Sequence, residues 1–204
     1  MAKIKNVVFD YGQVMIKYDP HYIVSRYIED TEDSELLERV VFDRIYHDRL
    51  DYAGITDEFA VSDIKRRLPE RLHEDAQKLY YAWIYNIPPI PGMAELVTEI
   101  KEKFGVRVFL LSNISSHFVN HKDEMPQLPL FEKCIFSCVY KVVKPDRRIY
   151  EILTSECAIK PEETIFIDDS EKNIKGARDF GISGYVFDGD VGRLRKYLFE
   201  LLGK

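Results

Sequence analysis

Five short runs of apolar residues recur along the chain, and their pattern predicts the fold class. They are Ile4–Phe9, Val106–Leu111, Cys134–Val139, Thr164–Ile167 and Gly184–Phe187. The runs are rich in Val, Ile and Phe and are continuous rather than alternating, which is typical of strands covered on both faces. Helical spacing of apolar residues accompanies the later runs, over Met93–Phe104, Arg148–Ala158 and Glu171–Phe180. Because strands that alternate with helices are joined by right-handed crossovers, we predict an α/β fold with a parallel sheet.

The alternation of strand and helix stops between about residues 18 and 90. Helical patterns occur there without a convincing strand, over Tyr22–Ile28, Ser34–Tyr46, Asp57–Leu68 and Glu74–Tyr85. Thr56 is a good helix N-cap in front of two acidic residues, and the proline-rich stretch 87–92 is typical of a stiff connector. We therefore predict an α/β core formed by residues 1–17 and 91–204. A helical insert, residues 18–90, interrupts this core after the first strand.

Composition excludes several classes of protein. The chain has 204 residues, of which 46% are hydrophobic and 31% charged, and a formal net charge of −6. This lack of basic excess argues against nucleic acid as a partner. No stretch approaches the ~20 apolar residues of a membrane span, and no signal region precedes the first strand. The cysteines, Cys134, Cys138 and Cys157, lack metal-ligand spacing and are expected to be reduced thiols, so we expect a cytoplasmic protein with no membrane partner.

Polar residues that could take part in catalysis or binding follow the predicted strands. They are Asp10 after the first, Ser112 and Asn113 after the second, Asp168 and Asp169 after the fourth, and Lys144 ahead of the helix that precedes the fourth. Each alone has a plain structural explanation, since an aspartate after a strand is more often a helix cap and Ser-Asn is ordinary turn chemistry. In an open parallel sheet, however, ligands bind beyond the carboxyl ends of the strands, so these residues can converge on one site.

Converged in this way, the residues favour phosphate chemistry with a metal ion. Three neighbouring carboxylates cannot all stay ionised without a cation, and a hard divalent ion such as Mg²⁺ takes oxygen ligands. Lys144 and Ser112 can then hold phosphate oxygens while Asp10 faces the phosphorus. A carboxylate in that position can act as a nucleophile and form an aspartyl-phosphate.

The same segments carry a family resemblance. An apolar strand with D-x-G-x-V, then LLSN, then VKPD-x-x-IY, then IFIDDS-x-x-N-I-x-G-A, occur in the order and spacing of motifs I to IV of the haloacid dehalogenase superfamily of phosphohydrolases. The chain resembles this superfamily over nearly the whole core, most specifically from Lys144 to Tyr150 and in PEETIFIDDSEKNIKGARDFGI. The resemblance implies a Rossmann-like sheet with strand order 5-4-1-2-3. It also implies that the helical insert is the family's small cap, which closes over the site and selects substrates.

The resemblance implies a role for each matching residue. Asp10 would be the nucleophile and a metal ligand, and the backbone carbonyl of Gly12 and the Asp169 carboxylate would also bind the metal. Asp168 would lie in or near the metal shell, and Asn173 would support it. Ser112 and Asn113 would bind phosphate, and Lys144 would neutralise both the phosphate and the nucleophile. The implied cofactor is Mg²⁺, and the implied partner is a small phosphorylated substrate.

Gly12 departs from the family pattern. Most phosphatases of this superfamily carry an aspartate there, which protonates the leaving group and then activates water, a contribution worth ~10²–10⁴-fold. The D-x-G-x-V form resembles a branch with sugar-1-phosphate phosphatases and, more broadly, the N-terminal phosphatase domain of epoxide hydrolase, with Gln13 in place of an asparagine. A residue of the insert or an ordered water could replace the proton donor. His47 and His117 are candidates by position only, because an isolated histidine is more often structural.

Three hypotheses follow for the function. The favoured one is a Mg²⁺-dependent phosphatase of a small phosphorylated metabolite, most simply a sugar phosphate, since residues 55–59 also resemble the cap of sugar-phosphate phosphatases. The second is a 2-haloacid dehalogenase-like hydrolase, because halide leaves without a proton. The third is a phospho-ligand-binding regulator that kept the fold and lost turnover. The metal-type carboxylates argue against the second, and the retained nucleophile and lysine argue against the third.

Overall fold

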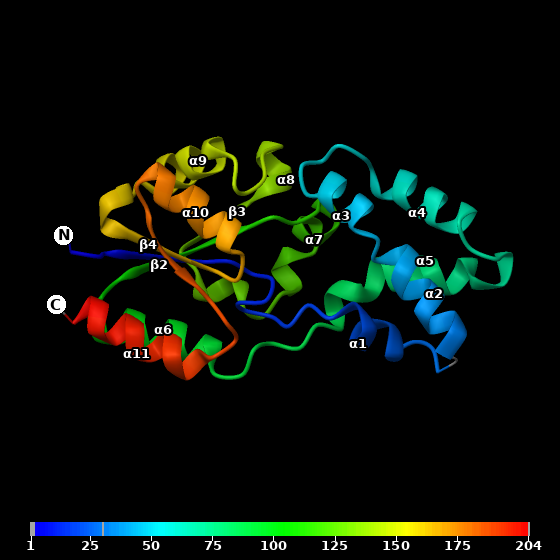
Figure 1. Cartoon of the computed structure of the whole chain (residues 1–204), viewed down its shortest axis with the longest axis horizontal. Helices are drawn as coiled ribbons and strands as arrows, with labels where there is room; N and C mark the ends of the chain where they lie inside the picture. The colour runs from blue at the N-terminus through cyan, green and yellow to red at the C-terminus, as the bar shows by residue number, and fades with distance from the viewer. Residues whose placement is uncertain (1–2, 30, 204) are drawn as a thin grey trace.

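The computed structural model describes residues 3–29 and 31–203, and its centre is a five-stranded parallel sheet. The strands are β1 (Asn6–Phe9), β2 (Arg107–Ser112), β3 (Lys133–Phe136), β4 (Thr164–Asp168) and β5 (Ser183–Val186). Their order across the sheet is β3-β2-β1-β4-β5, with β1 in the middle (Figure 1). Read from the other edge this is 5-4-1-2-3, so the predicted fold class and strand order are confirmed.

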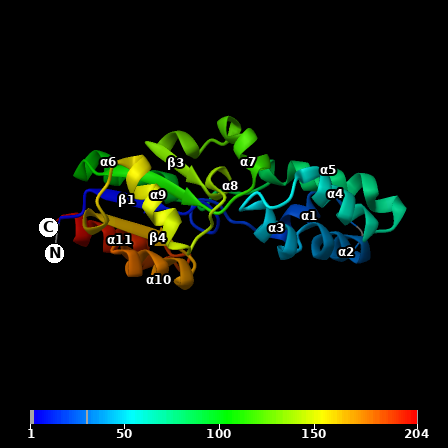
Figure 2. The same ribbon diagram turned by 90° about the horizontal axis from the view of Figure 1, so that it is seen from above.

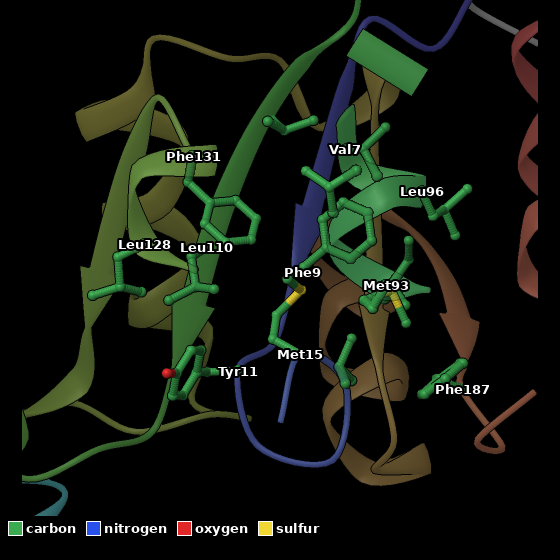
Figure 3. Packing of buried hydrophobic residues seen from close by; sticks show 14 of the residues in the cluster. Val7, Phe9, Tyr11, Met15, Met93, Leu96, Leu110, Leu128, Phe131 and Phe187 are labelled. Carbon is green, nitrogen blue, oxygen red and sulfur yellow. The ribbon is translucent and has the colours of Figure 1, made fainter. Parts of the chain in front are cut away.

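Helices cover both faces of the sheet, which explains the continuous apolar strands. On one face lie α6 (Met93–Phe104) and α11 (Val191–Leu202), and on the other α9 (Arg147–Cys157) and α10 (Glu171–Phe180) (Figure 1). Alternate residues of β1 enter different hydrophobic clusters: Val7 and Phe9 pack with α6 and α11, whereas Val8 packs with α9 and α10. Figure 3 shows the first cluster around Phe9, with side chains from β2 and α6 closing over it. Burial on both faces fixes β1 in place, and with it the residue that follows.

The segment between β1 and α6 is helical, as predicted. It contains α1 (Pro20–Ser25), α2 (Thr31–Val41), α3 (Arg44–Leu50), α4 (Asp57–Arg66) and α5 (His73–Ala82). These helices share a hydrophobic cluster of their own, whose buried members run from Ile23 to Tyr80. Both views place them beside the carboxyl end of the sheet, at the opposite end of the molecule from α11 (Figures 1 and 2). None of the described helices combines the length and apolarity that a membrane crossing needs.

Two predicted elements are wrong in detail. Ser34–Tyr46 is not one helix, because the chain leaves α2 at Val41 and restarts at Arg44, where extended Asp43 caps the new helix through the Ile45 amide. The third strand ends at Phe136, and the next residues form the short helix α8 (Ser137–Tyr140). Ser137 explains that change: its hydroxyl accepts a hydrogen bond from the Ile114 amide and donates one to the Asp51 carbonyl, which ties it to two other segments.

The remaining short elements complete the chain. They are α7 (Ser116–Asn120) and 3₁₀ turns at Glu70–Leu72, Trp83–Tyr85, Lys122–Glu124, Leu128–Leu130 and Pro161–Glu163. Helix α11 was not singled out by the sequence pattern; it buries Leu194, Leu198 and Leu202 against the face covered by α6.

Candidate active site

Asp10 lies where β1 leaves the sheet. Its amide donates to the Ile167 carbonyl of β4 at 2.9 Å, so the backbone is held in strand geometry up to this residue. Its carboxylate Oδ1 accepts from the Tyr11 amide at 2.7 Å and faces Lys144 Nζ at 2.7 Å. The side chain is 11% exposed and lines a pocket between the strand ends and the helical insert. A buried carboxylate at the end of the central strand is thus held in one orientation.

Lys144 joins Asp10 to Asp168. Its ammonium lies 2.8 Å from Asp168 Oδ2 and donates to the Leu111 carbonyl at 3.1 Å. Burial alone would lower the pKa of Lys144, but the two carboxylates outweigh it and raise that pKa above its ordinary value. Burial raises the pKa of Asp10 to about 7; Lys144 opposes the rise and Asp168 adds to it. One cation therefore shares two acidic neighbours, and the site has a surplus of negative charge.

The acidic cluster fits a divalent metal ion. Asp10, Asp168 and Asp169 each offer a carboxylate oxygen, and these oxygens lie within 4.8 Å of one another. Asp168 is fully buried and accepts from the Ser170 amide and from the Asn173 side chain, so its position is fixed. Partial desolvation of the Asp169 carboxyl and the nearby Asp168 charge raise the pKa of Asp169. A hard cation with oxygen ligands offsets this repulsion, so the donor set matches Mg²⁺ in both charge and chemistry.

The predicted phosphate residues lie beside this cluster, but their contacts differ. Ser112 ends β2 and lines the pocket. The Asn113 side chain forms two hydrogen bonds with the backbone of Lys144. Its Oδ1 accepts from the Lys144 amide at 2.8 Å, and its Nδ2 donates to the Lys144 carbonyl at 3.2 Å. Asn113 thus orients the lysine-bearing loop, a role that no sequence pattern indicated.

Gly12 faces open space. A Cβ built there has no atom within 4 Å, and the residue lines the pocket two positions after Asp10. Gln13 follows with a left-handed backbone, φ 57°, and donates from Nε2 to the Tyr18 carbonyl at 2.7 Å. The chain therefore turns immediately after Gly12, and no side chain occupies the place of an acid at that position.

The pocket lies between the strand ends and the helical insert and has a volume of about 250 Å³. The core lines it with Asp10, Tyr11, Gly12, Gln13, Ile16, Ser112, Asn113, Ile114, Ser115, His117 and Asp169. The insert lines it with Tyr18, Val41, Phe42, His47, Leu50, Asp51, Tyr80 and Trp83. The insert side is mostly apolar and aromatic: the Tyr18 ring packs edge-on against Phe42 and Trp83, with centroid distances of 6.3 and 5.6 Å.

Both candidate histidines line this pocket, but their hydrogen-bond partners differ. His117 is buried, and its Nε2 donates to the Tyr81 carbonyl of the insert at 2.8 Å, which joins core to insert. His47 has the Tyr18 hydroxyl 3.3 Å from its ring nitrogens, and burial lowers its pKa to about 4. At neutral pH His47 is therefore uncharged.

Asp51 is a further pocket residue that sequence reasoning missed. It follows the last residue of α3, and among the described residues none donates a hydrogen bond to its carboxylate. Burial raises its pKa to about 7, with contributions from Asp48 and Asp10, while Lys144 lowers it. Nothing in HDRLDYAG distinguishes this aspartate from its solvated neighbours, because only the folding of the insert onto the core turns it toward the site.

Fold and site together define a hydrolase of the α/β class, with its polar residues gathered at the carboxyl ends of parallel strands. The family model for haloacid dehalogenase-like hydrolases matches residues 4–181, so the chain belongs to that family and the predicted resemblance is confirmed.

Known relatives agree with this assignment. D-ribitol-5-phosphate phosphatase of Bacteroides thetaiotaomicron is 22% identical over 197 residues, which is 89% of this chain and 91% of that protein. A HAD family enzyme of the same species, solved as a mutant in complex with magnesium and inorganic phosphate, superposes with a TM-score of 0.67 at 26% identity, covering 94% of this chain and 98% of that one.

Other relatives match only in part. The bifunctional epoxide hydrolase 2 of Mus musculus is 35% identical over 66 residues, 32% of this chain. The matched region amounts to 12% of that protein, so the chain spans far less than two thirds of this relative.

Proposed function

We propose that this hydrolase is a Mg²⁺-dependent phosphatase that hydrolyses a small phosphorylated metabolite through a phospho-Asp10 intermediate. The observation that carries the proposal is the Asp10–Lys144–Asp168 arrangement, with Lys144 Nζ within 2.8 Å of both carboxylates, beside the pocket that Asp10 and a third acid, Asp169, line. This set provides a nucleophile, a buried cation and a metal site within one cluster.

Each residue then has a defined task. An Asp10 carboxylate oxygen attacks the phosphorus, the bond to the leaving oxygen breaks, and the phosphoryl group is held on Asp10 until water hydrolyses it. Lys144 keeps the Asp10 carboxylate oriented and offsets charge on the phosphoryl oxygens. Ser112 lines the same pocket and can donate to a phosphoryl oxygen. Asn113 keeps Lys144 in place through its backbone.

The metal ligands in this proposal are Asp10, Asp168, Asp169 and the backbone carbonyl of Gly12. A bound Mg²⁺ supplies charge neutralisation for the carboxylates and the phosphoryl group. Support comes from the Bacteroides thetaiotaomicron enzyme solved with magnesium and inorganic phosphate and from the tight grouping of the acidic oxygens.

The substrate class has two candidates. A sugar phosphate is supported by the similarity to D-ribitol-5-phosphate phosphatase. The lining of the insert side supports the other, a phosphate ester with an apolar or aromatic organic group, because Phe42, Leu50 and Trp83 offer little to hydrogen-bond a polyol. The pocket volume of about 250 Å³ suits a small ester in either case.

The two alternative functions have less support. Dehalogenation requires no metal, and without a cation the repulsion among the three clustered carboxylates would not be offset. A regulator without turnover would not need the buried Asp10–Lys144 pair, which is costly to desolvate.

Substituting the nucleophile tests the proposal. We expect Asp10→Asn to lose Mg²⁺-dependent phosphate release from a panel of sugar, alkyl and aryl phosphates, with an unchanged far-UV CD spectrum. The matched control is Asp123→Asn, because Asp123 is exposed and does not line the pocket; we expect it to keep full activity.

Three outcomes would contradict the proposal. Undiminished Mg²⁺-dependent release from Asp10→Asn would exclude the nucleophile. Halide release from 2-haloacids without Mg²⁺ would favour the dehalogenase. Binding of a phosphate analogue without turnover on the whole panel would favour the regulator.

A further inference from the structure

We propose that Asp51, presented by the helical insert, is the general acid and base that the position of Gly12 lacks. This inference rests on the phosphatase function proposed above. It assigns to the insert a part in the chemistry, in addition to substrate selection.

The backbone of Asp51 is tied to the core. Its carbonyl accepts a hydrogen bond from Ser137 Oγ at 2.5 Å, and the same hydroxyl accepts from the Ile114 amide at 2.9 Å. Ile114 follows Ser112 and Asn113 at the end of β2, and Ser137 follows β3. The end of α3 is thus fixed against the strand ends, which holds the Asp51 side chain at the edge of the site.

The carboxyl of Asp51 is available for proton transfer. It lines the same pocket as Asp10 and Gly12, and no hydrogen bond to it occurs among the residues that the structure describes. Asp10 and Lys144 both lie near enough to influence its charge. An acid must stand within hydrogen-bond reach of the leaving oxygen, and a carboxyl that lines the same pocket as the nucleophile can meet that requirement.

The environment of Asp51 favours the protonated form near neutrality. The titratable groups around it are Asp48 and His47 on α3, Asp10 and Tyr18 on the loop after β1, Lys144 ahead of α9, and Cys138 on α8. Burial, Asp48 and Asp10 raise its pKa to about 7, and Lys144 limits the rise. A carboxyl in this range can give a proton in one step and accept one in the next.

The other titratable groups of the pocket are less suited. His117 donates to the Tyr81 carbonyl, and the low pKa of His47 leaves its ring neutral near pH 7, without the imidazolium that would act as an acid. Asp169 belongs to the acidic cluster, and Tyr18 and Tyr80 have pKa values raised far above neutrality by burial.

The proposed steps balance as follows. As Asp10 forms its bond to phosphorus, the proton of the Asp51 carboxyl passes to the leaving oxygen, and the alcohol departs. Asp51 is then a carboxylate. It takes a proton from the water that attacks the phosphorus, the bond between phosphorus and Asp10 breaks, and inorganic phosphate is released with both carboxyl groups restored.

Leaving-group dependence gives the test. With Mg²⁺ present, kcat/KM reports steps up to alcohol departure. For Asp51→Asn we expect kcat/KM to fall about 10²-fold or more on an alkyl phosphate, which needs protonation, and less than about fivefold on p-nitrophenyl phosphate, which does not. If Asp51 had a purely structural role, Asp51→Asn would lower kcat/KM equally on both substrates.

The pH profile gives a second readout. In the wild type, kcat/KM on the alkyl phosphate should fall as pH rises through about 7, because Asp51 loses the proton that it donates. Asp51→Asn should lack that limb. Asp48→Asn is the matched control on the same helix, because Asp48 is exposed and does not line the pocket. At pH values below the limb it should keep kcat/KM on both substrates within about twofold. The limb itself should move to lower pH, because Asp48 contributes to the raised pKa of Asp51.

Rescue completes the experiment. The space at Gly12 can accept a side chain, so Gly12→Asp in the Asp51→Asn background should restore alkyl phosphate hydrolysis at least tenfold. Equal losses on both substrates, or wild-type rates in Asp51→Asn while Asp10→Asn is inactive, overturn the role of Asp51 and leave the phosphatase intact. An inactive wild type overturns the proposed function, and this inference falls with it.

Discussion

At the scale of single residues, Lys144 pairs with two buried carboxylates of the site at once. Its side chain is 1% exposed and lies between Asp10 and Asp168, so three charges are removed from water together. Such a group is stable only when every member is present, because each loss leaves a buried charge without a partner. The asparagine that holds the Lys144 backbone, and the Leu111 carbonyl that accepts from its ammonium, complete this arrangement.

Removal of this ammonium should be costly. We expect Lys144→Met to lower the free energy of unfolding by about 3–5 kcal/mol, measured by urea denaturation with a chelator present, because Asp10 and Asp168 remain buried and uncompensated. Lys175→Met is the control: Lys175 pairs with Asp179 on the surface, where side-chain exposures are 76% and 65%, and such pairs are worth about 0–1 kcal/mol. Equal losses of unfolding free energy in the two variants would mean that the buried ion pairs of Lys144 stabilise the fold no more than a surface pair does.

At the scale of elements, the approach of α10 to the loop that carries Lys144 depends on a glycine. A Cβ at Gly176 would lie 2.8 Å from Pro145 Cβ and 3.0 Å from the Pro145 carbonyl oxygen. Tyr150 of α9 lies at the same contact, with Cε2 3.2 Å from that Cβ, and donates from its hydroxyl to the Asn173 carbonyl at 2.7 Å. Helix α10 is therefore packed directly against the base of the site.

A methyl group should disturb this contact. We expect Gly176→Ala to destabilise the fold by about 1–3 kcal/mol through overpacking, although alanine is the better helix former. Gly12→Ala is a matched comparison with nothing within 4 Å of the added carbon, and its unfolding free energy should change little. Urea titrations of both variants decide the point; a Gly176→Ala protein as stable as the wild type would show that α10 can shift freely.

At the scale of the whole molecule, the site lies where two hydrophobic clusters meet. One cluster belongs to the sheet face under α6 and α11 and another to α1–α5, and the ribbons of these two parts adjoin (Figures 1 and 2). Residues of both parts line the pocket. Hydrogen bonds from His117 to the Tyr81 carbonyl and from Ser137 to the Asp51 carbonyl join the two parts. The division into a core of 1–17 and 91–204 and an insert of 18–90 remains a prediction, which separate unfolding of the two parts would support.

Ligands of the site should stabilise the whole chain. At a hundredfold excess over the dissociation constant, bound Mg²⁺ with inorganic phosphate should add about 2.7 kcal/mol, or a rise in Tm of roughly 5–10 °C for a chain of this length. Differential scanning fluorimetry should show the rise for the wild type and its loss after chelation. Asp169→Asn should reduce the Mg²⁺-dependent rise and Asp123→Asn should not; the same rise in both would place the metal elsewhere.

Much of the core could be predicted because its signals are local. The continuous apolar runs of β1, β2 and β4 follow from burial on both faces, and the parallel arrangement follows from the alternation with helices. The aspartates at strand ends could be located for the same reason, since neighbouring strands end at one edge of the sheet. The errors, at Ser34–Tyr46 and Cys134–Val139, occur where Asp43 and Ser137 form contacts that outweigh the apolar pattern.

By itself, then, the sequence determined the family, the strand order and the grouping of Asp10, Lys144, Asp168 and Asp169. Only the tertiary structure decided what surrounds them: that Asn113 holds the Lys144 backbone, that the insert wall is aromatic, and that Asp51 faces the pocket. The physical reason is the range of the interactions. Strand burial is encoded over a few residues, whereas a carboxyl at the end of α3 shares a pocket with Asp10 only after two separately packed parts of the chain have come together.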